Sequence, residues 1–216
     1  MNEKALYDGL IWYVCLVIIV TFHEFGHAWT AWKMGDDTAH RQGRVTLNPL
    51  AHIDLFGTVF LPLLSVLLAA SGSGLAGLII GWGRPVPVDL SQLKNRRRDD
   101  LLITLAGPGM NVVLAVLVLV ILRIGGFDYQ SEVFKFCLQL ATLSMFLCFF
   151  NLTPVPPLDG GRVLWSVTGM KEETFYRLSQ YGFIIIIVLI NIRLFSGVLV
   201  MFTLGSVRLL SGLLGL

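Results

Sequence analysis

Two histidines and a glutamate stand together in the segment His23-Glu24-Phe25-Gly26-His27. On an α-helix, residues four positions apart lie on one face about one turn from each other, so both imidazoles can bind a single Zn²⁺. Glu24 points about 100° away from His23 around the helix axis, so it can flank the metal without binding it. A carboxylate in that position can take a proton from metal-bound water, whose pKa the metal lowers to about 7. The spacing therefore predicts metal-assisted hydrolysis with Glu24 as the general base.

A third metal ligand is predicted at Asp159, because a catalytic zinc site usually has three protein ligands and one open position. Asp159 lies in the stretch NLTPVPPLDGG, residues 151–161, in which three prolines precede two glycines. Prolines restrict the backbone and glycines permit close approach, so this stretch can hold a carboxylate rigidly beside a helix. His23, His27 and Asp159 are therefore the predicted zinc ligands.

Asn151 and Asn111 are two further candidate site residues. Asn151 begins the proline-rich stretch, and its amide could orient a substrate backbone or stabilise a developing oxyanion. Helix capping and bonding between helices are the alternatives. Asn111 follows Gly107-Pro108-Gly109, a run that suits close contact between helices, so packing is favoured over catalysis for this residue. Both asparagines are kept as candidate contacts to substrate or oxyanion.

The elements that carry these residues are predicted to be membrane helices. Hydrophobic residues make up 55% of the 216 positions and charged residues 14%, whereas soluble domains contain about 25% charged residues. Apolar segments near the roughly 20 residues that cross a bilayer predict an all-α integral membrane protein. We expect one domain, residues 1–216, folded as a polytopic bundle of about five or six transmembrane helices. The predicted crossings are Asp8–Met34, Leu55–Ile80, Asp100–Ile124, Ser131–Leu152, Tyr181–Ile192 and Leu194–Leu210.

The region after the first predicted helix is less regular. The polar stretch Gly35–Asp54 is expected to lie at the surface or to re-enter the membrane, with a short strand at Gln42–Leu47. Pro62 and the run Ser71–Gly74 divide the segment Leu55–Ile80 into two pieces. These pieces can form a full crossing or a re-entrant hairpin whose non-helical backbone is covered by protein or lines a water-filled cavity. Both alternatives stay open.

Charged residues in the loops predict the orientation of the helices. Residues 81–99 contain five Lys and Arg against two Asp, whereas residues 125–130 contain Asp128 and no cation. The positive-inside rule then places the first loop in the cytoplasm and the second outside. We expect a multi-pass protein of the cell membrane, with Asp159 and the active site nearer the cytoplasmic face. The formal net charge of +2 is too small to indicate a nucleic-acid partner.

Taken together, the motifs resemble those of the site-2 protease family of intramembrane zinc metalloproteases. HEFGH at 23–27, AGPGMN at 106–111 and NLTPVPPLDGGR at 151–162 follow one another in the family's order. The resemblance implies a zinc ion bound by the three predicted ligands and a water activated by the motif glutamate. It also implies a substrate that is the transmembrane segment of another membrane protein, as in regulated intramembrane proteolysis. The chain resembles the short form, without a PDZ or nucleotide-sensing domain.

Two other functions also place polar residues inside a membrane bundle. A metal transporter is expected to repeat its ligands along a path, whereas this sequence has one compact set beside a base. A catalytically silent scaffold is expected to lack the glutamate or a ligand, and all four residues are present here. We therefore favour the protease and keep both alternatives, while the natural substrate and the oligomeric state are not indicated.

Overall fold

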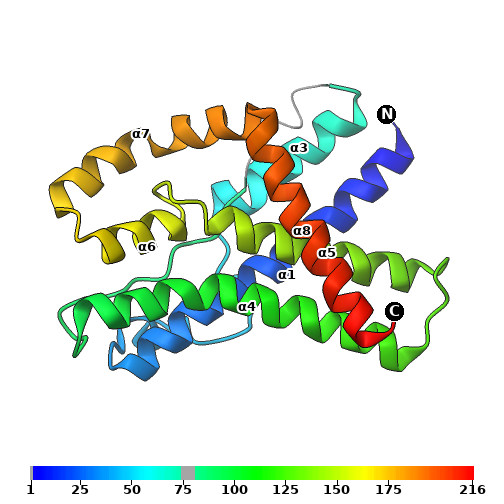
Figure 1. The fold of residues 1–216 in the computed structure, drawn as a ribbon. Helices are drawn as coiled ribbons and strands as arrows, with labels where there is room; N and C mark the ends of the chain where they lie inside the picture. Colours follow the sequence, from blue (N-terminus) through cyan, green and yellow to red (C-terminus); the bar gives the residue numbers. More distant parts are fainter. Residues whose placement is uncertain (1, 74–80) are drawn as a thin grey trace.

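The computed structural model describes residues 2–73 and 81–216, and within these ranges the chain is helical and contains no β-strand (Figure 1). Five helices in the described part of the chain are long and apolar enough to cross a membrane. They are α1 (Glu3–Met34), α4 (Arg96–Gly125), α5 (Glu132–Asn151), α7 (Glu172–Asn191) and α8 (Arg193–Leu214). The predicted all-α polytopic bundle is confirmed.

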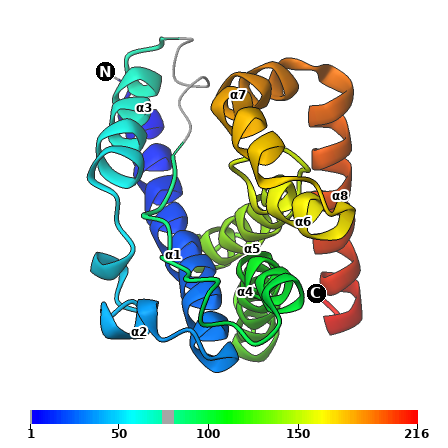
Figure 2. The ribbon, with the colours of Figure 1, turned by 90° about the vertical axis from the view of Figure 1, so that its left-hand side faces the viewer.

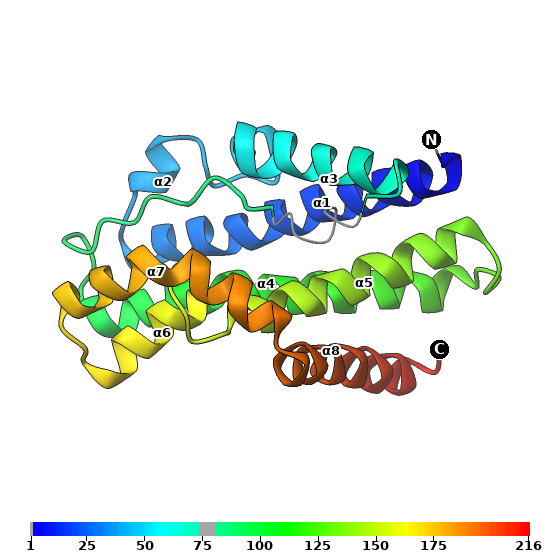
Figure 3. The same ribbon diagram turned by 90° about the horizontal axis from the view of Figure 1, so that it is seen from above.

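Helices α1, α4 and α5 form the centre of the bundle and run side by side (Figure 3). α1 and α4 are antiparallel, because the start of the second helix lies beside the end of the first. Apolar side chains fill the space between the three helices, and Cys15, Ile19, Leu119 and Ala141 are completely buried there. Large apolar side chains also cover the outside, and Ile124 is 80% exposed, as expected where lipid replaces water as the solvent.

α1 ends at Gly35, whose φ of 109° belongs to the left-handed region that glycine adopts without strain. The Gly35 N–H donates to the carbonyls of Ala31 and Trp32, which would otherwise lack partners at the helix end. The chain then forms two short helices, α2 (Thr38–Arg41) and η1 (Pro49–Ala51). Both lie at the end of α1 that carries the histidine motif.

The strand predicted at Gln42–Leu47 is wrong, because these residues form a turn and a bend. A strand is stable only when a neighbouring backbone satisfies its N–H and C=O groups. Here the N–H groups of Gln42, Gly43 and Arg44 instead donate to carbonyls of the preceding helix α2. The buried Arg44 side chain contacts another segment, where Nη2 donates to the carbonyl of Arg84 at 2.5 Å. Gly43, with φ of 68°, also turns the chain away from an extended path.

The second apolar segment begins as a π-helix, η2 (Leu55–Phe60), and continues as α3 (Leu61–Ala70). Together these form one apolar helical stretch, which is shorter than the five long helices. α3 packs antiparallel on the first half of α1, where Val66 lies against Gly9 and the Ala70 carbonyl accepts from the Asn2 N–H. Residues 74–80, which complete the predicted crossing, lie outside the described residues.

The two ends of this apolar segment lie next to each other. The Trp82 N–H donates to the Gly57 carbonyl at 3.1 Å, and the Arg84 N–H donates to the His52 carbonyl at 2.9 Å. The chain therefore leaves and returns at the same level along α1, which is the arrangement of a re-entrant segment. Of the two alternatives that the sequence leaves open, the described residues favour this one.

The remaining helices cover the opposite side of α1 from α3 (Figure 2). Residues 152–158 turn the chain after α5, with a cis peptide bond between Pro156 and Pro157, and α6 (Asp159–Thr168) follows. α7 and α8 are joined at Ile192, where the chain bends, and α8 then runs away from α7 (Figure 1). Packing of α8 against α5 includes Phe149 and Phe202, whose ring centroids are 5.6 Å apart.

Candidate metal centre

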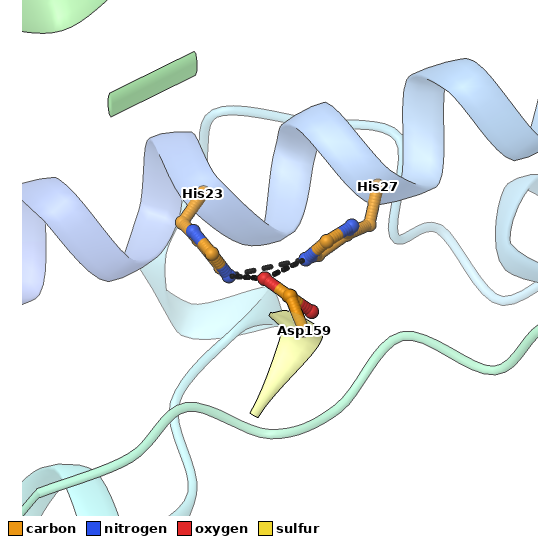
Figure 4. A group of neighbouring side chains, drawn as sticks. All are labelled: His23, His27 and Asp159. Atoms are coloured by element: carbon orange, nitrogen blue, oxygen red, sulfur yellow. Dashed lines mark hydrogen bonds and ion pairs between the residues drawn. The ribbon is translucent and has the colours of Figure 1, made fainter. Parts of the chain in front are cut away.

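His23 and His27 project from one face of α1 towards the first residue of α6, Asp159 (Figure 4). The Nε2 atoms of the two histidines are 3.1 Å apart. Asp159 Oδ2 lies 3.2 Å from His23 Nε2 and 3.5 Å from His27 Nε2. The side chains are largely shielded, with exposed fractions of 12% for each histidine and 17% for the aspartate.

The three donor atoms fit a zinc ion. Ligand atoms about 2.0–2.1 Å from a tetrahedral zinc lie roughly 3.4 Å from one another, and the observed separations of 3.1, 3.2 and 3.5 Å are close to this value. Asp159 Oδ2 is buried and has no hydrogen-bond partner among the described residues, which a metal ion would supply. Two imidazoles and one carboxylate are also a donor set of catalytic zinc sites. The structure thus brings the three predicted ligands together.

Two glycines in the first turn of α6 allow Asp159 to reach the histidines. A side chain at Gly160 would collide with the carbonyls of Leu152 and Thr153. A side chain at Gly161 would likewise collide with the backbone of the proline-rich turn. The tight fold of NLTPVPPLDGG therefore depends on both glycines, as the sequence pattern indicated.

An ion pair fastens α6 to α4 one turn beyond Asp159. Arg162 Nη2 lies 3.0 Å from Asp100 Oδ1, and Ser166 Oγ donates to Asp100 Oδ2 at 3.2 Å. The Asp100 side chain is only 1% exposed, so its charge needs this partner. These contacts fix the direction of α6 and with it the position of the third ligand.

α4 lies directly behind the two histidines. His27 Nδ1 donates to the Ile103 carbonyl at 2.8 Å, and a Cβ at Gly107 would lie only 2.5 Å from His27 Cε1. On α1, a Cβ at Gly26 would lie 2.6 Å from the Ala106 carbonyl oxygen. The two glycines permit the close contact between helices that was predicted for AGPGMN, whereas Gly109 of the same motif faces open space.

Asn111 and Asn151 both line the cavity at the ligands but differ in exposure. Asn111 is 1% exposed, and its Nδ2 lies 3.4 Å from His23 Nδ1. Asn151 is half-buried, and its Nδ2 donates to the Leu147 carbonyl at 3.0 Å at the end of its own helix. Asn151 is thus the more accessible of the two to a substrate.

Glu24 is buried, with 9% of its surface exposed, and it lines the same cavity as the ligands. Its carboxylate lies beside Gly83, where an added Cβ would be 3.1 Å from Glu24 Oε1. This carboxylate is the titratable group expected to act on water at the metal.

The segment 81–88 forms one wall of this cavity and is held from behind. Trp82 and Arg84 each use both their N–H and their C=O groups in bonds to the rest of the chain. Their partners are the Gly57 carbonyl, Thr58 Oγ1, the His52 carbonyl and the Arg44 guanidinium. The wall is therefore fixed in place beside Glu24.

The cavity has a volume of about 490 Å³ and is mainly apolar apart from the site residues. Its polar members are His23, Glu24, His27, Thr104, Asn111, Asn151, Asp159 and Arg162. A cleft of this size with few converging polar groups is typical of an enzyme site.

His40 and His52 lie outside the cluster. His40 is exposed and stacks on Trp32 with ring centroids 4.7 Å apart. His52 is 1% exposed and its Nε2 donates to the Thr46 carbonyl at 2.8 Å, while its buried Nδ1 has no partner in residues 2–73 and 81–216. Burial lowers the pKa of His52, because a second proton would be buried on Nδ1.

A comparison with protein families decides where this chain belongs. The model of peptidase family M50 matches residues 11–131 and 126–190, a range that includes His23, Glu24, His27 and Asp159. The chain belongs to peptidase family M50. This is the site-2 protease family, so the resemblance seen in the sequence motifs is confirmed.

Individual relatives agree with the family match. The protein named "Putative zinc metalloprotease YwhC" of Bacillus subtilis (strain 168) is 36% identical over 195 residues, 86% of this chain and 82% of that protein. "Putative zinc metalloprotease Rip2" of Mycolicibacterium smegmatis is 32% identical over 78% of this chain and 61% of its own length. "Zinc metalloprotease MJ0392" of Methanocaldococcus jannaschii is 22% identical over 79% of this chain and 38% of its own length. No solved structure matches this chain significantly.

The structure of this M50 peptidase adds site residues that sequence reasoning missed. They are the Ile103 carbonyl behind His27, the Asp100–Arg162 pair, and the wall at Trp82 and Gly83. A signal existed for the pair, because Asp100 is a charge at the start of an apolar helix and Arg162 ends the ligand motif. The backbone carbonyl and the wall leave no such signal in residue types.

Proposed function

We propose that this M50 peptidase is an intramembrane zinc metalloendopeptidase. His23, His27 and Asp159 hold the zinc ion, and Glu24 is the general base. The observation that carries the proposal is the spacing of the three donor atoms, 3.1 to 3.5 Å, beside a buried carboxylate on a helix of membrane-spanning length. The names of the relatives, which describe zinc metalloproteases, support the same metal.

The side chains of the site divide the chemistry between them. When bound, zinc lowers the pKa of its water and polarises the scissile carbonyl. Glu24 takes a proton from that water as it attacks, and afterwards passes the proton to the leaving amine. Asn151 faces the cavity and can donate to the developing oxyanion if its amide leaves the Leu147 carbonyl. The buried position of Glu24 excludes bulk water from the proton transfer.

The substrate we propose is the transmembrane segment of another membrane protein. The cavity at the ligands is mainly apolar, as expected for a site that receives hydrophobic side chains from the bilayer. A helical segment hides its carbonyls in its own hydrogen bonds, so it has to unwind locally before attack. The fixed wall at 81–88 keeps its position while this happens.

The site is proposed to lie nearer the cytoplasmic face of the cell membrane. The cations Arg96, Arg97 and Arg98 begin α4, five to seven residues before Ile103, which backs the histidines. The opposite end of α4 leads into the loop with Asp128 and no cation. Because cations mark cytoplasmic loops, the ligand end of the bundle is assigned to that side.

The test is zinc content and cleavage of a model transmembrane substrate by the purified protein in detergent. Wild type is compared with Glu24→Gln, Asp159→Asn and a matched control, Glu173→Gln, which alters an exposed glutamate paired with Arg177. We expect about one zinc ion per wild-type chain. Glu24→Gln should keep its zinc and lose roughly 10²- to 10⁴-fold in rate, the usual contribution of general-base catalysis.

Other outcomes separate the protease from its rivals. If Glu24→Gln cleaves as fast as wild type, Glu24 is not the base. A protein that takes up no zinc in zinc-replete medium overturns the proposed metal site. Zinc uptake into proteoliposomes, unaffected by Glu24→Gln, would support a metal transporter, and zinc binding without cleavage of any transmembrane substrate would support a scaffold.

A further inference from the structure

The contact behind His27 shows which of its nitrogens carries a proton. A carbonyl oxygen only accepts, so His27 Nδ1, 2.8 Å from the Ile103 carbonyl, must carry the hydrogen. This leaves His27 Nε2, which faces Asp159 together with His23 Nε2, as the nitrogen that can bind a metal.

The Asn111 amide lies behind His23 as the Ile103 carbonyl lies behind His27. Its Nδ2 is 3.4 Å from His23 Nδ1. The other end of the amide, Oδ1, is buried and has no hydrogen-bond partner among the described residues, and the whole residue is only 1% exposed. An unpaired buried carbonyl oxygen is costly, so the amide carries an acceptor that the arrangement leaves unused.

A zinc ion bound through His23 Nε2 determines which partner His23 Nδ1 needs. A metal ion at the three donor atoms takes the lone pair of His23 Nε2, so the neutral imidazole must carry its proton on Nδ1. That N–H needs an acceptor at the place where Asn111 Nδ2 lies. The two ends of a carboxamide have nearly the same shape, and a half-turn of the terminal torsion exchanges them. Oδ1 then accepts from His23 Nδ1.

We propose that Asn111 is a positioning residue for the zinc ligand His23, whose Nδ1–H donates to the Asn111 Oδ1 when zinc is bound. The proposal rests on the proposed function, since it assumes that the three donor atoms hold zinc. Each histidine then donates Nδ1–H to an oxygen of α4: His27 to the Ile103 carbonyl and His23 to Asn111 Oδ1. Ser144 Oγ donates to the Asn111 backbone carbonyl at 2.8 Å, so α5 holds the main chain at this point.

The residue type explains why the position is an asparagine. An aspartate would also accept from His23 but would bury a charge, and a leucine of similar size would neither accept nor donate. Partners that orient a metal-bound histidine typically contribute 10- to 100-fold in metal affinity. Asn111 is therefore a contributor to zinc affinity, in place of the substrate or oxyanion contact considered from the sequence.

The test measures zinc affinity by competition with a chelator, in wild type and in Asn111→Leu, Asn111→Asp and Ser144→Ala. We expect roughly 10- to 100-fold weaker zinc binding in Asn111→Leu. Asn111→Asp should bind zinc at least as tightly as wild type, because it keeps the acceptor. Ser144→Ala removes the neighbouring bond between α4 and α5 without touching His23, so it should keep wild-type affinity. Visible absorption of the Co²⁺-substituted proteins should change in Asn111→Leu and be restored in Asn111→Asp.

The outcomes are separable from those of the proposed function. If wild type binds no zinc, the metal centre itself is wrong. If wild type binds zinc and Asn111→Leu binds it equally well, only the role of Asn111 is overturned. Should Asn111→Leu fail to fold, Asn111→Ala takes its place with the same expected loss. Asn111→Asp also stands alone as a test, since a loss of affinity in that variant contradicts an acceptor role.

Discussion

Gly107→Ala should weaken zinc binding, because a methyl group at this position meets both histidine rings. A Cβ at Gly107 would lie 2.5 Å from His27 Cε1 and 2.8 Å from His23 Cε1, whereas non-bonded carbons lie about 3.5–4.0 Å apart. The rings or α4 must therefore move by about 1 Å, while a metal site tolerates about 0.2 Å in its ligand distances. Overpacking of this kind costs about 1–3 kcal/mol. If this cost applies only to the zinc-bound state, it corresponds to a loss of roughly 5- to 140-fold in zinc affinity.

The assay is zinc competition with a chelator, combined with thermal unfolding of the same preparations in detergent. Gly109→Ala is the matched control, because it lies two residues further along α4 and has no atom within 4 Å of the added Cβ. That control should keep its zinc affinity and gain up to about 1 kcal/mol in stability, as expected for alanine in a helix interior. Equal zinc affinities in Gly107→Ala and Gly109→Ala would refute the reasoning.

Two further predictions concern the supports of the site. Arg162→Met leaves the Asp100 carboxylate buried without its cation, so we expect a lower zinc content and a stability lower by about 1–3 kcal/mol. This loss is smaller than for a fully buried pair, because Arg162 is itself 37% exposed. Thermal unfolding and metal analysis check this against Arg177→Met, which breaks an exposed ion pair, and equal losses would contradict it. His52→Gln should make the protein less sensitive to acid, because burial lowers the pKa of His52 and the unfolded chain therefore takes up its proton first as the pH falls below about 6.5. Below that pH, wild-type stability falls by up to about 1.4 kcal/mol per pH unit relative to His52→Gln. Melting temperatures measured at about pH 7.5 and about pH 5.5 check this. His40→Gln, which changes an exposed histidine, is the control and should lose stability with acid as wild type does.

The local part of the site could be predicted from the sequence because it depends on helix periodicity alone. His23 and His27 share a face of α1 whatever surrounds them. The approach of Asp159 depends on contacts across more than 130 residues, and it was reached through the composition of the turn and the family motif. The partner of Asn111 could not be predicted, because it depends on how far α4 slides along α1. Gly26 and Gly107 set that register by allowing close contact, and only the assembled pair of helices shows it.

The fold was predictable where apolar length decided the outcome and not where tertiary contacts did. Long apolar runs identified α1, α4, α5 and α8, because a run of about 20 apolar residues has few other stable arrangements. α7 was predicted only from Tyr181, whereas it begins at Glu172, because the residues before Tyr181 are largely polar. The pattern at Gln42–Leu47 suggested a strand, but the N–H groups of its first three residues bond back to the short helix α2. The return of the chain at Trp82 likewise depends on a backbone bond to Gly57 that no local pattern reveals.

The antiparallel contact between α1 and α4 has a consequence for biogenesis. His27 meets Ile103, and His23 meets Asn111, only when the two helices are inserted with opposite directions. A molecule in which the ribosome and the insertion machinery have left α1 inverted cannot bring the histidines, their α4 supports and Asp159 to one point. A preparation in which some molecules have α1 inverted should therefore contain less than one metal ion per chain, even when metal is in excess.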